Sequence, residues 1–305
     1  MKQFSDLAAR AVPRLMQLGA ACLLGLATLG ASAYSGPAAL QAKYSALHEQ
    51  LRSNNFHRAL HIDSSQHGDT LQGDVYAVLD YPFATVTEAL KNPADWCDIM
   101  LLPFNTKYCR AAGSDDQAVL QMGIGRKYDQ PAGDAYRLDF RWQPIAAQRD
   151  YFETRLTAAE GPLGTRDYRI AVSTVPLGDG HTFMRLSYSY GYGLTGRLAM
   201  QGYLATAGAN KVGFTVKGRD SNGQPIYMGG VRGAVERNAM RYYLAIDAYL
   251  ASLKAPSSQQ QAKRIQTWFD STERYARQLH EMDRGTYAAM KRGEYERQHQ
   301  HAAIR

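Results

Sequence analysis

The cysteine pair in the stretch WCDIMLLPFNTKYC, Cys97 and Cys109, is the first group of residues in this sequence that could do chemistry. Two such thiols can form a redox centre, bind zinc or close a disulfide. The pair lacks the CxxC spacing of redox motifs, and no histidine or second cysteine pair lies at zinc-ligand spacing from it. We therefore predict a structural disulfide, which requires that the protein reach an oxidising compartment.

The N-terminus predicts export to such a compartment. A basic head, MKQFSDLAAR, precedes an almost entirely apolar run at residues 15–31, and the ASA pattern that ends at Ala33 suits signal peptidase. The apolar run is short for a membrane span, with an uncleaved anchor as the alternative. We predict that residues 1–33 are removed and that the mature chain, beginning at Tyr34, is periplasmic or secreted.

Charge and motifs argue against several classes of function. The formal net charge is +7, and removal of the signal region, with its three basic residues and one acidic residue, lowers it to +5. The basic residues are scattered among acidic ones, so nucleic-acid binding is not expected. The glycine-containing turns GIGRK and GPLGT lack the strand-to-helix context of a phosphate loop, and His57, His61 and His67 lack metal-ligand spacing. No cofactor or metal is predicted.

The elements that must position any functional group follow from the spacing of apolar residues. Residues 38–55 have helical spacing and lead into a polar, glycine-containing stretch. A strand that ends at Pro82 comes next, followed by two short helices at 83–91 and 94–102. Cys97 therefore lies on the second short helix, and Cys109 lies on the strand after it.

A series of strands follows, each rich in β-branched and aromatic residues and most of them bounded by Gly, Pro or Asp turns. Their sequences are AVLQMGIGRKY, AYRLDFRWQPIAA, DYFETRLTAA, RDYRIAVSTVPL and HTFMRLSYSYGYG. In AYRLDFRW, apolar residues alternate with charged ones, which is typical of an antiparallel sheet with one buried face. The short loops favour consecutive hairpins.

The C-terminal third predicts mainly helices. Residues 194–207 predict a helix, KVGFTVKG one more strand, and 229–253 a long helix. Beyond Pro256, SSQQQ predicts a linker, and an amphipathic stripe over 265–282 predicts a helical tail. The predicted regions are a signal peptide (1–33), an N-terminal helical extension (34–68), a main domain (69–255), and a linker with a C-terminal amphipathic helical tail (256–305).

The order of these elements resembles the helix-grip fold of the START/SRPBCC superfamily, in which a curved antiparallel sheet wraps around a long C-terminal helix. The resemblance covers about residues 73–253 and rests on GDVYAVLDYPFATVTEALKNPADWCDIM and on RYYLAIDAYL. It implies an α+β fold that holds a lipid or other hydrophobic ligand between sheet and helix, and some members are cyclases or hydrolases. Export and the inserted segment GYGLTGRLAMQGYLATAGANK depart from the common pattern.

Candidate ligand-binding residues come first from the strands. Tyr136, Phe140 and Trp142 share one face of their strand, and Tyr188 and Tyr190 share one face of theirs. Together they would line an amphipathic pocket in which tyrosine hydroxyls fix a polar head group. The alternative for any one of them is ordinary packing between sheet and helix.

The long helix supplies the remaining candidates. A stripe at helical spacing consists of Glu236, Met240, Tyr243 and Asp247. Its two carboxylates would line a cavity and orient a polar head group, or act as acid and base. The alternative, which is the commoner role of carboxylates on helices, is pairing with an arginine such as Arg232 or Arg237.

The function that we favour from the sequence is a periplasmic binding or carrier protein for a lipid or other hydrophobic small molecule, without a cofactor. One alternative is a cyclase- or hydrolase-type enzyme that uses Glu236 or Asp247 together with tyrosines. Another is an envelope interaction protein without a pocket, whose C-terminal amphipathic helix makes transient contact with a partner or a membrane surface.

Overall fold

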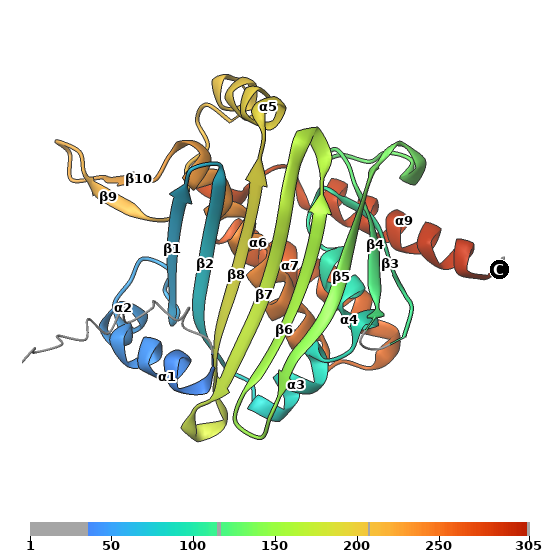
Figure 1. The fold of residues 1–305 in the computed structure, drawn as a ribbon, viewed down its shortest axis with the longest axis horizontal. Helices are drawn as coiled ribbons and strands as arrows, with labels where there is room; N and C mark the ends of the chain where they lie inside the picture. Colours follow the sequence, from blue (N-terminus) through green and yellow to red (C-terminus); the bar gives the residue numbers. More distant parts are fainter. Residues whose placement is uncertain (1–35, 115–116, 207, 304–305) are drawn as a thin grey trace, which may run out of the picture. The chain divides into compact units, whose positions relative to one another are not determined.

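The computed structural model describes residues 36–303, apart from residues 115, 116 and 207. Its centre is an eight-stranded antiparallel sheet with the order β1-β2-β8-β7-β6-β5-β4-β3 (Figure 1). The strands are β1 (Leu60–His67), β2 (Thr70–Leu79), β3 (Thr106–Ala112), β4 (Val119–Ile124), β5 (Tyr136–Ala147), β6 (Phe152–Glu160), β7 (Thr165–Pro176) and β8 (Thr182–Tyr192). From β3 to β8 the strands are consecutive hairpins, as the short loops predict. The predicted signal peptide lies outside the described residues.

The edge strand β1 was not predicted. Its residues after Ile62 are polar, and we had assigned them to the extension that ends at residue 68. In the structure β1 pairs with β2 through a tight turn, in which Gly68 adopts a positive φ of 55°. Only Leu60 and Ile62 of β1 are buried apolar residues, so the alternation is too short to identify a strand.

The long helix α6 (Gly230–Ser252) packs on one face of the sheet, against β1, β2 and β8 (Figure 1). Its closest approach is at Gly73 of β2, where an added Cβ would lie 3.1 Å from the Val235 carbonyl oxygen and 3.3 Å from the Ala239 Cβ. Glycine therefore lets the helix rest directly on β2. The fold is α+β with a helix-grip arrangement, a large antiparallel sheet that holds a long C-terminal helix.

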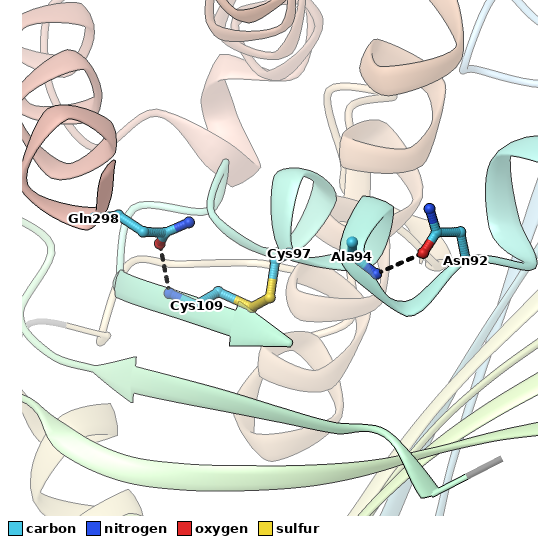
Figure 2. Close-up of a disulfide and its surroundings, with 5 residues drawn as sticks. All are labelled: Asn92, Ala94, Cys97, Cys109 and Gln298. Carbon is cyan, nitrogen blue, oxygen red and sulfur yellow. Dashed lines mark hydrogen bonds between the residues drawn. A yellow bond between two sulfur atoms is a disulfide. The ribbon is translucent and has the colours of Figure 1, made fainter. Parts of the chain in front are cut away.

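Two short helices, α3 (Phe83–Leu90) and α4 (Pro93–Met100), connect β2 to β3 as predicted. Asn92 caps α4, because its side-chain oxygen accepts a hydrogen bond from the Ala94 backbone N–H at 3.0 Å (Figure 2). A disulfide joins Cys97 of α4 to Cys109 of β3 (Figure 2). The predicted disulfide is confirmed, and it fixes α4 to the edge strand of the sheet.

The N-terminal helices α1 (Pro37–Ala46) and α2 (His48–Arg52) begin the described chain. They replace the single predicted helix over 38–55. Leu40 and Leu47 are buried with Tyr76, Val175 and Phe183. Since Tyr76 alternates along β2 with residues that face α6, these helices cover the opposite face of the sheet.

The C-terminal helices α7 (Ser257–Glu273), α8 (Ala276–Leu279) and α9 (Arg284–Ala303) share the core of the sheet and α6. SSQQQ, predicted as a linker, forms the first turns of α7 instead, because a polar sequence is compatible with an exposed helix face. The stripe predicted over 265–282 packs on its own chain, where Trp268 and Leu279 are fully buried. The Gln298 side chain of α9 accepts a hydrogen bond from the Cys109 N–H at 2.9 Å (Figure 2).

The segment between β8 and α6 differs from the prediction in one respect. Helix α5 (Leu194–Ala205) is present, but KVGFTVKG does not add a strand to the main sheet. It contributes β9 (Val216–Arg219), which pairs only with β10 (Pro225–Tyr227) in a separate hairpin that projects beside β1 (Figure 1). No helix within the described ranges is long and apolar enough to cross a membrane.

Candidate ligand-binding site

The face of the sheet that turns toward α6 carries an aromatic surface built from three strands. Across the strands, Trp142 pairs with Leu156, Leu156 with Ile170, and Ile170 with Tyr188. Because antiparallel neighbours place paired side chains on the same face, Trp142 of β5 and Tyr188 of β8 belong to one row.

A second group of rings lies beside this row. The Tyr168 ring of β7 stacks on the Tyr190 ring at 5.5 Å between centroids and meets the Phe140 ring edge-on at 6.2 Å. Tyr188 joins the same cluster, with its ring centroid 5.6 Å from that of Tyr190. These contacts make the interior amphipathic, since each tyrosine combines an apolar ring with a polar hydroxyl.

Helix α6 closes the aromatic surface from the other side. The Tyr242 ring lies 5.2 Å from the Tyr188 ring, and Asn238, one turn earlier, hydrogen-bonds the Tyr188 hydroxyl. Tyr188 and Tyr190 are buried, whereas Tyr168 and Tyr242 are half-buried. Solvent therefore reaches the edge of the cluster but not its centre.

A hollow of about 310 Å³ lies at the end of β8. Its lining residues are Gln66, Gly68, Tyr192, Arg197, Met200, Gln201 and Val231. Tyr192 follows Tyr190 and Tyr188 on one face of β8. Val231 lies on the same face of α6 as Asn238 and Tyr242. The hollow, which α5 flanks, thus lies at the end of the strand and the helix that carry the cluster, with Tyr192 as its tyrosine.

The tyrosine hydroxyls of this region stay protonated at ordinary pH. Burial raises the pKa of Tyr188 well above its usual value, and it raises the pKa values of Tyr190 and Tyr242 as well. The hydroxyls therefore act as neutral hydrogen-bond donors and acceptors. Tyr168, for example, donates to the Thr165 hydroxyl oxygen at 2.8 Å.

Trp142 differs from the other two tryptophans of the chain, although all three are buried. The Trp96 indole N–H donates to the Leu90 carbonyl at 2.9 Å, and the Trp268 indole N–H donates to the Arg241 carbonyl at 3.1 Å. The Trp142 indole N–H has no hydrogen-bond partner within the part of the chain that the structure describes. It is an unused donor on the inner face of the sheet.

Among the residues predicted to line the pocket, the strand residues fall into two groups. Phe140, Trp142, Tyr188 and Tyr190 lie together on the inner face. Tyr136 lies at the start of β5 and is 47% exposed, so it does not join the buried aromatic cluster. Burial is the main cause of the raised pKa of Tyr168, and Tyr136 adds a smaller contribution.

The predicted carboxylate Glu236 lies away from the tyrosines. It is fully buried, and both of its oxygens are occupied. Oε1 accepts hydrogen bonds from the hydroxyls of Ser64 at 2.6 Å and Thr215 at 2.8 Å, and Oε2 accepts from the backbone N–H groups of Phe214 at 2.6 Å and Thr215 at 3.0 Å. Glu236 therefore ties α6 to β1 and to the segment before β9.

The rest of the predicted helix stripe is structural in the same way. Asp247 forms an ion pair with Arg58 at 3.1 Å, and the Arg58 guanidinium lies over the Tyr243 ring at 5.1 Å. Met240 is fully buried between these positions on the stripe. Pairing is thus the role of both carboxylates, but the partners are Ser64, residues 214–215 and Arg58.

The arginines suggested from the sequence bind elsewhere. Arg232 donates to the hydroxyl and carbonyl oxygens of Ser64, and Arg237 donates to the Val212 carbonyl. The sequence could not supply the true partners of Glu236 and Asp247, because they are distant along the chain.

Sequence reasoning missed Tyr168, Asn238 and Tyr242. Tyr168 had a usable signal, because it alternates with Ile170 and Val172 on β7. Asn238 and Tyr242 are four residues apart on α6, but both faces of this helix are largely apolar. The helical wheel alone therefore could not tell which face meets the sheet.

No known protein family matches the sequence, and no curated protein matches it. Solved structures with some likeness are a conserved protein from Geobacillus kaustophilus (12% identity, TM-score 0.35, 59% of this chain and 95% of that chain), Ara h 8.0201 (10%, 0.35, 63% and 99%) and norcoclaurine synthase from Thalictrum flavum (16%, 0.30, 46% and 87%). We draw nothing about function from likeness at these TM-scores, so the site rests on its own geometry.

Proposed function

We propose that the protein binds a hydrophobic small molecule with a hydrogen-bond acceptor between the sheet and α6. The observation that carries this proposal is the buried Trp142 indole N–H, which has no hydrogen-bond partner among the described residues. A buried donor that is left unsatisfied costs about 1–3 kcal/mol, and such a cost is compensated when a ligand supplies the acceptor. Phe140, two residues away on the same face of β5, and the tyrosine cluster that its ring contacts supply the apolar surface that a hydrophobic body needs.

The opening beside α5 supports the same proposal. The hollow there is bounded by Met200 of α5, by Val231, which precedes the cluster residues on α6, and by Tyr192, which follows them on β8. Such a combination of apolar walls and a few fixed polar groups is typical of small-molecule sites.

Export is part of the proposed function. The N-terminal pattern that ends at Ala33 and the disulfide between Cys97 and Cys109 both favour an oxidising compartment such as the periplasm. In that compartment the protein would carry its ligand between envelope sites. We do not propose acid–base catalysis by Glu236 or Asp247, since their oxygens are held by structural contacts.

The test uses the full mature chain and the apolar dye N-phenyl-1-naphthylamine. We expect saturable binding at about one equivalent, together with a hydrophobic molecule that is released when protein purified from its native envelope is extracted for mass spectrometry. Val231→Trp, which fills the hollow, should weaken dye binding at least tenfold, whereas Ile226→Trp on the exposed strand β10 should not. A folded protein that binds no dye and releases no molecule would refute the proposal.

A further inference from the structure

A second hollow, of about 500 Å³, lies outside the proposed site, beside the start of β1. Four segments form it: the end of α2 with the loop after it, the start of β1, the β9–β10 hairpin with the residues before it, and the α7–α8 junction. Its lining includes Phe56, Phe214, Tyr227, Arg274, Tyr275 and Arg277. We call it the α2–α8 groove.

Three aromatic rings make the apolar part of the α2–α8 groove. The Phe214 ring centroid lies 5.8 Å from that of Phe56 and 5.7 Å from that of Tyr275, and the Phe56 and Tyr275 centroids are 6.1 Å apart. The Tyr275 hydroxyl donates to the Phe56 carbonyl at 3.1 Å, which holds the two segments together. The rings are therefore a preformed surface rather than loose side chains.

Two arginines supply the charge. Arg274 and Arg277 are both exposed, and neither forms an ion pair with any residue in the described ranges. The Arg277 guanidinium lies over the Tyr227 ring at 5.0 Å, which orients it without neutralising it. A planar guanidinium that is held on a ring in this way is well suited to meet an anionic group.

The carboxylates nearest in sequence are engaged with other partners. Glu273 pairs with His280 at 2.9 Å, and Asp63 pairs with His61 at 2.9 Å and with Lys43 at 3.5 Å. None of the lining residues, all of which belong to the described chain, is acidic. Glu236 also bonds to the lining, but it is buried and accepts from Phe214 and Thr215. The groove therefore combines an aromatic floor with two exposed arginines that form no ion pair within the described residues.

We propose that the α2–α8 groove binds a small aromatic organic anion. The aromatic body would lie against Phe56, Phe214 and Tyr275, and its carboxylate, sulfonate or phosphate would meet Arg274 and Arg277. A hollow of this size suits one small molecule. The groove shares no lining residue with the hollow beside α5, so the proposal does not depend on the function proposed above.

The experiment compares two dyes with almost the same aromatic body. 8-Anilinonaphthalene-1-sulfonate carries an anionic group, and N-phenyl-1-naphthylamine does not. We expect the double variant Arg274→Gln, Arg277→Gln to raise the Kd of the sulfonate about tenfold, as expected for the loss of two charge-assisted contacts, and to leave the Kd of the neutral dye unchanged. Added salt should weaken sulfonate binding to the wild type more than to this variant.

A matched double variant, Arg149→Gln with Arg292→Gln, removes the same charge from two exposed arginines outside the groove. It should change the Kd of the sulfonate less than twofold. Circular dichroism and urea unfolding establish that both variants fold. An unchanged Kd in the groove variant, an equal loss of sulfonate binding in both variants, or an equal loss of both dyes in the groove variant would each overturn the proposal. Failure of the neutral dye to bind at all would count against the interior site only.

Discussion

The two sides of α6 use buried polar groups in opposite ways. On the side toward β1, the oxygens of Glu236 accept four hydrogen bonds, and Asp247 has its own arginine. On the side toward the sheet interior, the polar groups are neutral, and the Trp142 indole N–H on the same sheet face, three strands from Tyr188, has no partner within the described residues. A buried charge without partners costs so much free energy that the fold needs it to be paired, whereas an unsatisfied neutral donor costs little enough to remain until a ligand binds. The carboxylates of this helix therefore belong to the scaffold, whereas two neutral groups, the Trp142 N–H and the Tyr243 hydroxyl on the Glu236–Asp247 stripe, have no partner within the described residues.

The largest effect is expected from Glu236→Ala. This change leaves two hydroxyls and two backbone N–H groups without their acceptor in a buried place, so we expect the free energy of unfolding to fall by about 4 kcal/mol. Urea unfolding measures it. The Kd of N-phenyl-1-naphthylamine for the folded fraction should not change, because Glu236 lies away from the tyrosines.

Glu236→Gln is the control, since it keeps one carbonyl oxygen and the same shape. It should cost about half as much as the alanine variant. If Glu236→Ala is as stable as the wild type, or if it abolishes dye binding while the fold is intact, the two sides of α6 do not differ as we describe.

The disulfide is expected to give the next largest effect. Cys97→Ser should lower the free energy of unfolding by about 3 kcal/mol in oxidising buffer, because it releases a constraint on the unfolded chain. With a reductant present, wild type and variant should unfold at similar urea concentrations, and dye binding should be the same in both. Alkylation that finds two free thiols in the folded wild type would contradict the structural role and weaken the case for export.

A smaller, pH-dependent effect is expected at Glu281, which is the centre of an ion cluster. Its carboxylate lies 2.6 Å from an Arg241 nitrogen, 2.7 Å from the Lys127 nitrogen and 3.5 Å from the Lys211 nitrogen. Burial alone would raise the pKa of Glu281, but Arg241 and Lys127 outweigh burial and lower the pKa below the ordinary 4.5. The stabilisation is therefore complete above the unfolded-state value and is lost as the pH falls through the lower folded-state value.

Glu281→Gln isolates this effect. At pH 7 the variant should be less stable than the wild type by about 1 kcal/mol, and the difference should shrink toward zero as the pH falls below 4.5. Urea unfolding of both proteins across that range measures it. A difference that stays constant with pH would assign the effect to packing rather than to the charge of Glu281.

The sequence predicted the parts of this fold that depend on local periodicity. The alternation in AYRLDFRW identified β5 and its buried residues Leu138, Phe140 and Trp142, although it also placed the exposed Tyr136 on that face. Short loops predicted the hairpins from β3 to β8, and the predicted export together with the cysteine spacing predicted the disulfide. Each of these features depends on residues that are close together in the sequence, so it can be predicted without knowing the contacts between distant segments.

The features that escaped prediction depend on contacts between distant segments. β1 is polar beyond Ile62 and forms a strand because its backbone pairs with that of β2. Glu236 is structural because Ser64 and Thr215 approach it from distant parts of the chain. The site was half predicted for the same reason: strand alternation placed Phe140 and Tyr188 correctly, but only the packing of α6 on Gly73 decides that Tyr242 faces them.

The smallest effect on stability is expected from replacing the tryptophans. These replacements also test most directly whether the two sides of α6 differ in their use of buried polar groups. Trp142→Phe and Trp96→Phe remove the same volume from buried positions. Trp96→Phe also leaves the Leu90 carbonyl without its donor, so it should be the less stable variant by about 1 kcal/mol. Trp268→Phe, which leaves the Arg241 carbonyl without its donor, should resemble Trp96→Phe.

For ligand binding we expect the opposite ranking: Trp142→Phe should have the larger effect on the Kd, and Trp96→Phe the smaller. A naphthalene dye that carries a ketone, such as prodan, can accept the Trp142 N–H, whereas N-phenyl-1-naphthylamine has no comparable acceptor. Trp142→Phe should therefore weaken prodan about fivefold, which corresponds to one hydrogen bond of about 1 kcal/mol, and leave the other dye unchanged. Trp96→Phe should change neither dye. If Trp142→Phe is as destabilising as Trp96→Phe and weakens both dyes equally, the indole packs like any other core residue, and the neutral side of α6 is scaffold as well.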